Sequence, residues 1–196
     1  MKTISVFGSS QVRPGDPVYA DAEALGRGLA QAGYAVMSGG YRGVMEAVSK
    51  GAREAGGSVI GVTTDQISSR FAVQPNAWLS EIHHYALLRD RLLHMVERAD
   101  GYLAMPGGVG TLHEIAETWE LLRIGALPRR PFVVYGEMWK MLIRELQATR
   151  FLAGGCEERY VAWALQPADA IDLLDNWWQR MNLDALPPKV GPSLSP

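Results

Sequence analysis

Short apolar runs alternate with longer helix-like stretches along most of the chain. Five runs have the length of a strand and are mostly apolar: 4–7, 34–37, 58–62, 102–105 and 131–135. Because they show little polar alternation, they are typical of strands that are buried on both faces of a parallel sheet. The helix-like stretches between them are 18–32, 44–55, 84–99, 111–123 and 138–149.

This alternation predicts an α/β fold, a Rossmann-like doubly wound parallel sheet with helices on both faces. No internal repeat or change of composition divides the chain, so we expect one domain over residues 1–186. Residues 187–196 contain four prolines and have the composition of a mobile tail. Residues 63–76 form the one long irregular connection, which is either a binding loop or a surface excursion without a role.

Composition narrows the classes of protein that fit. Apolar residues make up 47% and charged residues 20%, which excludes a disordered chain. The net charge of −2 offers no basic footprint, so we expect no nucleic acid as a partner. The single cysteine, Cys156, cannot form an internal disulfide, and no apolar run is long enough to span a membrane. We therefore expect a cytoplasmic protein that does not bind membranes.

Three glycine-bearing turns follow three of the predicted strands, at residues 8–10, 38–43 and 106–111. In a doubly wound sheet the carboxyl ends of the strands share one edge, where ligands bind. Glycine lets an anionic group approach the backbone amides, and the following helix N-terminus adds unpaired N–H groups. The alternative is that these glycines only make tight turns. We predict a ligand that carries a phosphate, bound by Gly8, Ser9, Gly39, Gly40, Gly43, Gly107, Gly108, Gly110 and Thr111.

The common nucleotide fingerprints are absent. No lysine follows a glycine in the register of a P-loop, and the first turn reads G-S-S instead of G-x-G-x-x-G. A P-loop NTPase and a dinucleotide dehydrogenase are therefore both disfavoured. His83, His84 and His113 have no ligand spacing with cysteine or a second acidic residue, so we expect no metal site.

The third turn carries a longer motif. Residues 106–114 read P-G-G-V-G-T-L-H-E and match P-G-G-x-G-T-x-x-E. This motif resembles the signature of the LONELY GUY (LOG) family, the cytokinin riboside 5′-monophosphate phosphoribohydrolases. The resemblance covers about residues 4–135. Three residues, Ser38, Arg42 and Leu92, depart from the family pattern, and Leu92 takes the place of the family's lysine. The chain therefore looks like a divergent member of the family.

The resemblance implies hydrolysis of the N-glycosidic bond of a nucleoside 5′-monophosphate, AMP or an N6-modified AMP, without a cofactor. It places catalytic roles on Glu114 and Arg91, with Glu117 one helical turn further on, and it implies a homodimer or higher homo-oligomer. Spacing alone allows other roles. Thr111 and Glu114 also have the spacing of a helix capping box, and Arg91 lies at the edge of an apolar stripe, where arginines often extend along the surface.

A second function also remains open. Related Rossmann-like proteins that carry a phosphate-bearing cofactor have similar glycine turns, so a nucleotide- or molybdopterin-binding carrier without catalysis is the alternative. The aromatic residues Trp163, Trp177 and Trp178 near the end of the chain are expected to close the core or to form part of a subunit interface.

Overall fold

The structure is a computed structural model that describes residues 1–149 and 160–183. The predicted tail and Cys156 lie outside these residues. Within them, one parallel sheet has seven strands: β1 (Thr3–Phe7), β2 (Ala35–Ser38), β3 (Val59–Thr64), β4 (Glu81–Tyr85), β5 (Gly101–Ala104), β6 (Phe132–Tyr135) and β7 (Ala162–Ala164). Their order across the sheet is β4-β3-β2-β1-β5-β6-β7, and every neighbouring pair is parallel.

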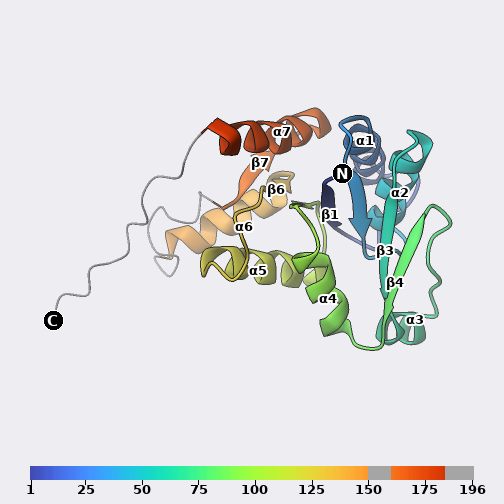
Figure 1. Cartoon of the computed structure of the whole chain (residues 1–196). Helices are drawn as coiled ribbons and strands as arrows, with labels where there is room; N and C mark the ends of the chain where they lie inside the picture. The colour runs from blue at the N-terminus through green and yellow to red at the C-terminus, as the bar shows by residue number, and fades with distance from the viewer. Residues whose placement is uncertain (150–159, 184–196) are drawn as a thin grey trace.

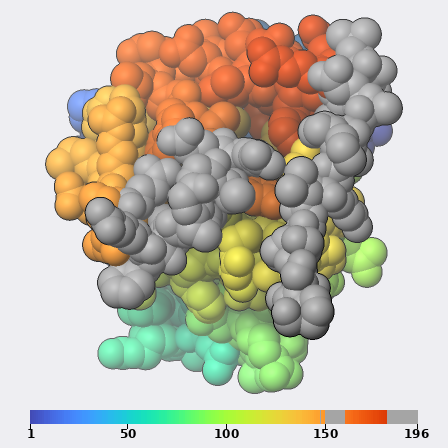
Figure 2. All heavy atoms as spheres, turned by 90° about the vertical axis from the view of Figure 1, so that its left-hand side faces the viewer, coloured from blue at the N-terminus to red at the C-terminus, as the bar shows by residue number. Residues whose placement is uncertain are grey.

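Helices cover both faces of this sheet (Figure 1). One face packs against α1 (Pro17–Gln31), α2 (Val44–Glu54) and α7 (Pro167–Leu183). The other face packs against α4 (Leu88–Glu97), α5 (Val109–Arg123) and α6 (Glu137–Ala148). From the side that lies to the left in Figure 1, α7 runs across one end of the molecule and α5 lies below it (Figure 2). These layers confirm the predicted α/β doubly wound fold.

The core strands are buried because they are apolar on both faces. The residues of β2, β5 and β6 are all buried, and the two helical layers fill the space on either side of the sheet. Trp163 and Trp178 pack against the core, as expected for the aromatic cluster near the end of the chain. In the described part of the chain, no helix is both long enough and apolar enough to cross a membrane.

Two predicted helix starts and the irregular conformation predicted for one connection were wrong. The helix expected over residues 84–99 begins at Leu88, because residues 81–85 form the edge strand β4. The helix expected from Thr111 begins at Val109 instead. The connection at residues 63–76 is not irregular throughout, since it contains the short helix α3 (Asp65–Phe71). Neither β7 nor α7 was predicted from the sequence.

The strand order reverses at β1, and this reversal positions the site. The neighbours of β1 are β2 on one side and β5 on the other, so the chain leaves β1 and β5 toward opposite faces of the sheet. Such a switch point leaves a crevice beyond the carboxyl ends of the strands. The loops that follow the two strands are held together here by the N–H of Ser9, which donates to the carbonyl of Pro106 at 3.1 Å.

Candidate functional site

A cavity of about 420 Å³ opens at this switch point. Its walls come from the turns after β1, β2 and β5 and from helices α2, α3, α4 and α5. Of the residues predicted from the sequence, seven line it: Gly8, Ser9, Arg91, Gly108, Gly110, Thr111 and Glu114. Gly39, Gly40, Gly43, Gly107 and Glu117 are not among the lining residues.

The N-terminus of α5 forms one wall of the cavity. Its first internal hydrogen bond runs from the N–H of Leu112 to the carbonyl of Gly108 at 2.9 Å. The N–H groups of Val109, Gly110 and Thr111 precede that bond and have no partner within the helix, and all three residues line the cavity. Free amides at the positive end of a helix dipole bind anions. This wall can therefore hold a phosphate.

Glu114 does not belong to a capping box. The N-cap of α5 is Gly108, with no side-chain capping hydrogen bond, so Glu114 is the sixth residue of the helix. A capping box needs the glutamate at the third helical position. The alternative reading of this residue is therefore wrong. The carboxyl group instead lines the cavity, with only 13% of its side chain exposed.

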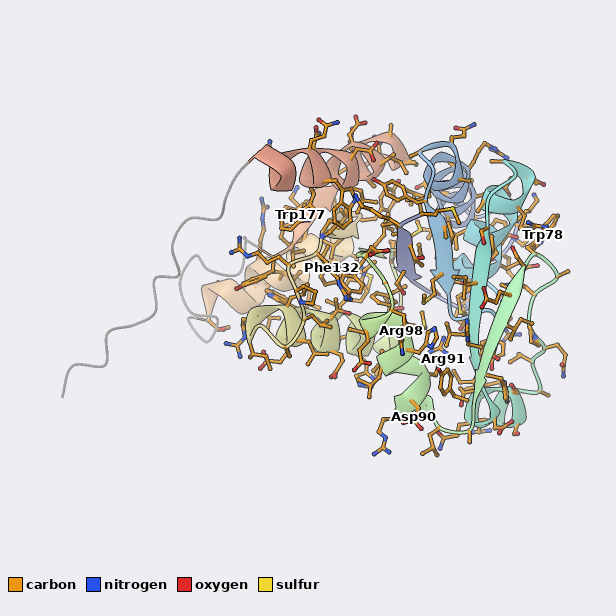
Figure 3. All side chains as sticks on the ribbon, in the orientation of Figure 1. Trp78, Asp90, Arg91, Arg98, Phe132 and Trp177 are labelled. Carbon is orange, nitrogen blue, oxygen red and sulfur yellow. The ribbon has the colours of Figure 1, made fainter. Side chains whose placement is uncertain are left out.

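Arg91 is the partner of this carboxyl group. It extends from α4 toward the sheet (Figure 3), where its Nε donates to the carbonyl oxygen of Val62 at 2.8 Å. Its Nη1 lies 3.6 Å from Oε1 of Glu114. Arg91 is only 5% exposed, so the alternative role, an arginine extended along the surface, is wrong. The structure brings the two residues together inside the cavity, although 23 positions separate them in the sequence.

Burial dominates the electrostatics of Glu114. It raises the pKa of the carboxyl group from 4.5 to about 7, against the opposing charge of Arg91, which lowers it. A carboxyl group with this pKa is populated in both its ionised and its neutral form at neutral pH. Such a perturbed pKa within a cleft is a common feature of active sites.

Two of the predicted glycines that do not line the cavity leave room for side chains that do. A Cβ at Gly39 would lie 1.8 Å from Nη2 of Arg91, so glycine makes room for the guanidinium. A Cβ at Gly107 would lie 2.2 Å from Oγ1 of Thr111, which leaves no space for a side chain beside the α5 N-terminus. Glu117 is half-buried one turn further along α5.

The apolar part of the cavity comes largely from the connection at residues 63–76, for which a binding loop was one of the two alternatives, but none of its individual residues was predicted. Ile67 and Phe71 from α3 line it together with Leu88 from α4, and Leu92, the departure from the family lysine, lies in the same wall. The spacing of Ile67 and Phe71, four residues apart, is the helical signal that could have identified this wall. Among residues 1–149 and 160–183, no three histidine, cysteine, aspartate or glutamate side chains are grouped so that they could hold a metal ion.

Comparison with known protein families gives one extended match. The model of a family described as the SLOG cluster4 family matches residues 1–137 of this chain. The matched part contains every strand from β1 to β6 and all the residues that line the cavity.

Curated relatives match over part of their length. A cytokinin riboside 5′-monophosphate phosphoribohydrolase of Rhodococcoides fascians is 33% identical over 133 residues, which are 65% of this chain and 65% of the relative. A protein of Oryza sativa subsp. japonica described as a probable cytokinin riboside 5′-monophosphate phosphoribohydrolase is 35% identical over 107 residues, 53% of this chain and 43% of the relative. The chain thus spans less than two thirds of each of these relatives.

Solved structures match over nearly the whole chain. The molybdenum cofactor binding protein of the phototrophic bacterium Rippkaea orientalis superposes with a TM-score of 0.71 and 25% identity, covering 90% of this chain and 97% of its own. The molybdenum cofactor carrier protein of Chlamydomonas reinhardtii superposes with a TM-score of 0.68 at 22% identity, covering 91% and 98%. The second likeness is one of fold alone.

Proposed function

The chain belongs to the SLOG cluster4 family, and on that premise we propose that it hydrolyses the N-glycosidic bond of a nucleoside 5′-monophosphate. One water is consumed, and the products are the free base and ribose 5-phosphate. The curated relatives support this proposal, because their names assign them the same class of reaction on cytokinin riboside 5′-monophosphates.

The observation that carries the proposal is the buried Arg91–Glu114 pair beside the free amides of α5, within one cavity. Glycosidic bond cleavage develops positive charge on the ribose, and a carboxylate close to the reacting carbon stabilises that charge. The amides of Gly110 and Thr111 would hold the phosphate and fix the ribose beside the carboxyl group. The amides alone could bind a phosphate, and the carboxyl group alone could stabilise a cation. Only a site with both can hold the phosphate so that the ribose lies beside the carboxyl group.

We assign the following roles. Glu114 is the catalytic residue that stabilises the ribose charge in its ionised form. Arg91 is a positioning residue, because it pairs with Glu114 and its Nε is already bonded to Val62. The pKa of about 7 lets Glu114 also exchange a proton with the attacking water at neutral pH. Glu117 lies outside the cavity lining, so its catalytic role remains a prediction, which Glu117→Gln tests.

The apolar wall supports a purine as the base, and in particular one with an apolar N6 substituent. Ile67, Phe71 and Leu88 offer side chains without hydrogen-bonding groups at the part of the cavity formed by α3 and α4. Phe71 is 61% exposed, so a substituent that covers it would remove apolar surface from water.

The experiment is incubation of the protein with AMP and, separately, with N6-isopentenyl-AMP, with chromatographic measurement of the free base. We expect base release from both, with the larger kcat/KM for the N6-modified substrate. The nucleosides without phosphate serve as the control and are expected to react far more slowly. If no purine or pyrimidine monophosphate releases its base, the chain is not a phosphoribohydrolase.

The likeness to the Rippkaea orientalis protein favours a second candidate, a carrier of a phosphate-bearing cofactor such as molybdopterin. The same α5 amides would hold its phosphate, and Glu114 would then have no reaction to serve. Calorimetric titration discriminates between the two functions. A carrier binds AMP or the cofactor without any release of base, whereas the proposed enzyme converts AMP during the titration.

A further inference from the structure

The cavity contains a second guanidinium that the assigned roles do not use. Arg42 lies in the turn between β2 and α2, it is exposed, and it lines the cavity. In the described part of the chain its side chain has no hydrogen bond and no ion pair. Arg91, the other arginine of the lining, is bonded to Val62 and paired with Glu114. Arg42 is thus the lining arginine whose charge no group of the described residues offsets.

The backbone on both sides of Arg42 is held in place. Gly40 and Gly43 have φ of 77° and 75°, values that L side chains rarely adopt. A Cβ at Gly43 would lie 2.3 Å from the carbonyl oxygen of Ser9, so this turn packs directly on the first glycine turn. On the other side, Nδ2 of Asn76 donates to the carbonyl of Tyr41 at 2.9 Å. The fold therefore fixes the Cα of Arg42 at the cavity and leaves its side chain free to meet a ligand.

Charge balance indicates which ligand group it meets. A 5′-phosphate brings a charge of about −1.5 to −2 at neutral pH. The N-terminus of α5 supplies the equivalent of roughly +0.5. Arg91 adds little, because the ionised form of Glu114 offsets it. Without a further cation the bound phosphate would lie in a cavity with a marked excess of negative charge. Arg42 supplies one full positive charge and a planar fork that fits two phosphate oxygens.

We propose that Arg42 binds the 5′-phosphate of the substrate together with the N-terminal amides of α5. This inference rests on the proposed function for the identity of the substrate. It makes Arg42 the residue by which this cavity distinguishes a nucleotide from the nucleoside that lacks the phosphate. Arg42 stands at a position where the chain departs from the family pattern, so the resemblance assigns it no role.

The test compares Arg42→Ala and Arg42→Lys with Arg89→Ala as the matched control. Arg89 is an exposed arginine on α4 that does not line the cavity, so its loss removes the same net charge from the protein. We expect Arg42→Ala to raise KM for AMP by about 10- to 100-fold, the effect of one charged hydrogen-bonding contact. We expect kcat to change by less than about threefold, Arg42→Lys to recover part of the loss, and Arg89→Ala to resemble the wild type.

Inorganic phosphate and AMP binding, measured by calorimetry, separate this inference from the proposed reaction. If the wild type binds AMP without turnover, the proposed function fails, and weaker binding by Arg42→Ala alone still supports the phosphate contact. If the KM and the Kd of Arg42→Ala both stay within about twofold of the wild type, Arg42 does not bind the phosphate. The same conclusion follows if the wild type binds neither AMP nor inorganic phosphate.

Discussion

The carboxyl group of Glu114 is 13% exposed and has a pKa of about 7. Its ionisation therefore lowers the free energy of unfolding of the protein. The attraction of Arg91 only partly offsets the loss of hydration, since the net shift of the Glu114 pKa is upward. The ionised form is nevertheless the one that the proposed reaction uses to stabilise the ribose. Stability and activity therefore favour opposite protonation states of the same residue.

This conflict predicts a pH dependence of stability that belongs to Glu114. The folded-state pKa lies above the unfolded value, so the folded chain binds more protons between these two pH values. Its contribution to stability is fully present below about pH 4.5 and is lost as the pH rises through about 7. We expect Glu114→Gln, which resembles the neutral acid, to match the wild type near about pH 4. Near about pH 8 it should have the larger free energy of unfolding, by on the order of 3 kcal/mol.

Urea denaturation of both proteins at the two pH values measures this difference. Glu117→Gln, a substitution of the same kind one turn away, serves as the control and should leave the pH dependence of the wild type unchanged. If Glu114→Gln and the wild type lose stability in parallel as the pH rises, the carboxyl group of Glu114 does not carry the raised pKa.

The sequence identified Arg91 and Glu114 as a pair through the family motif but could not give their burial. Arg91 lies at the edge of the apolar stripe of α4, a position that is exposed on an isolated helix. Its burial results from β3, which supplies the carbonyl of Val62, and from Gly39, which makes room for the guanidinium. These contacts join segments distant in sequence, and helical periodicity within one stretch does not encode them.

At the scale of secondary-structure elements, the turn after β2 packs closely against the Arg91 side chain of α4. Because a Cβ at Gly39 would lie 1.8 Å from Nη2 of Arg91 and 2.6 Å from the sulfur of Met45, the side chains around it must move to accept a methyl group. We expect Gly39→Ala to displace Arg91 from Glu114 and lower kcat by about tenfold or more, since small misplacements in an active site have large effects on rate. The loss should fall on kcat more than on KM, because the phosphate-binding amides of α5 are untouched.

Gly28→Ala on α1 is the matched control. Its Cβ would lie 3.2 Å from the flexible end of Ile171, far from the cavity in the fold, and the helix favours alanine over glycine. Steady-state kinetics of both variants with AMP test whether Gly39 is needed to position Arg91. Unchanged kcat in Gly39→Ala would mean that Arg91 is not positioned through this turn.

The elements that the sequence revealed are those with strong local patterns. The strands β1, β2, β3, β5 and β6 are short apolar runs, and each was predicted. The edge strand β4 was not predicted, and its last two residues were read as the start of a helix, because its residues are mostly polar, including His83 and His84. It forms because it pairs with β3, which is a contact between distant segments. The same reason explains why β7, three residues long at the other edge, was missed.

For the whole molecule, the strand order explains why three glycine turns and the apolar side chains of α3 meet in a single cavity. The class of fold could be predicted from the sequence, because parallel strands joined by helices close into a doubly wound sheet. The position of the switch point beside β1 could not be predicted, since the sequence does not state which strands are neighbours. The structure supplies it, and the site follows from it.

Exposed apolar residues of α3, α4 and the start of α5, three of which line the cavity, predict self-association. Val109, Leu112, Leu88 and Phe71 are 84%, 40%, 37% and 61% exposed. Apolar side chains gathered beside a cleft are typical of an interface. We expect a homodimer in size-exclusion chromatography with light scattering, and Leu112→Asp should shift it toward the monomer. Leu165→Asp, on the exposed residue that follows β7, is the control and should remain dimeric. A wild type that is monomeric at all concentrations would contradict this prediction.

The central claim is that Glu114 in this cavity cleaves a glycosidic bond, and the rate of base release by the wild type and Glu114→Gln tests it most directly. Both proteins are assayed with AMP and N6-isopentenyl-AMP, with free base and ribose 5-phosphate measured in the same reaction. We predict equal amounts of the two products from the wild type and a kcat lower by on the order of 10²-fold or more in Glu114→Gln. The variant should melt at a temperature no lower than the wild type near neutral pH. Near wild-type turnover in Glu114→Gln, or no release of base by the wild type, would contradict the claim.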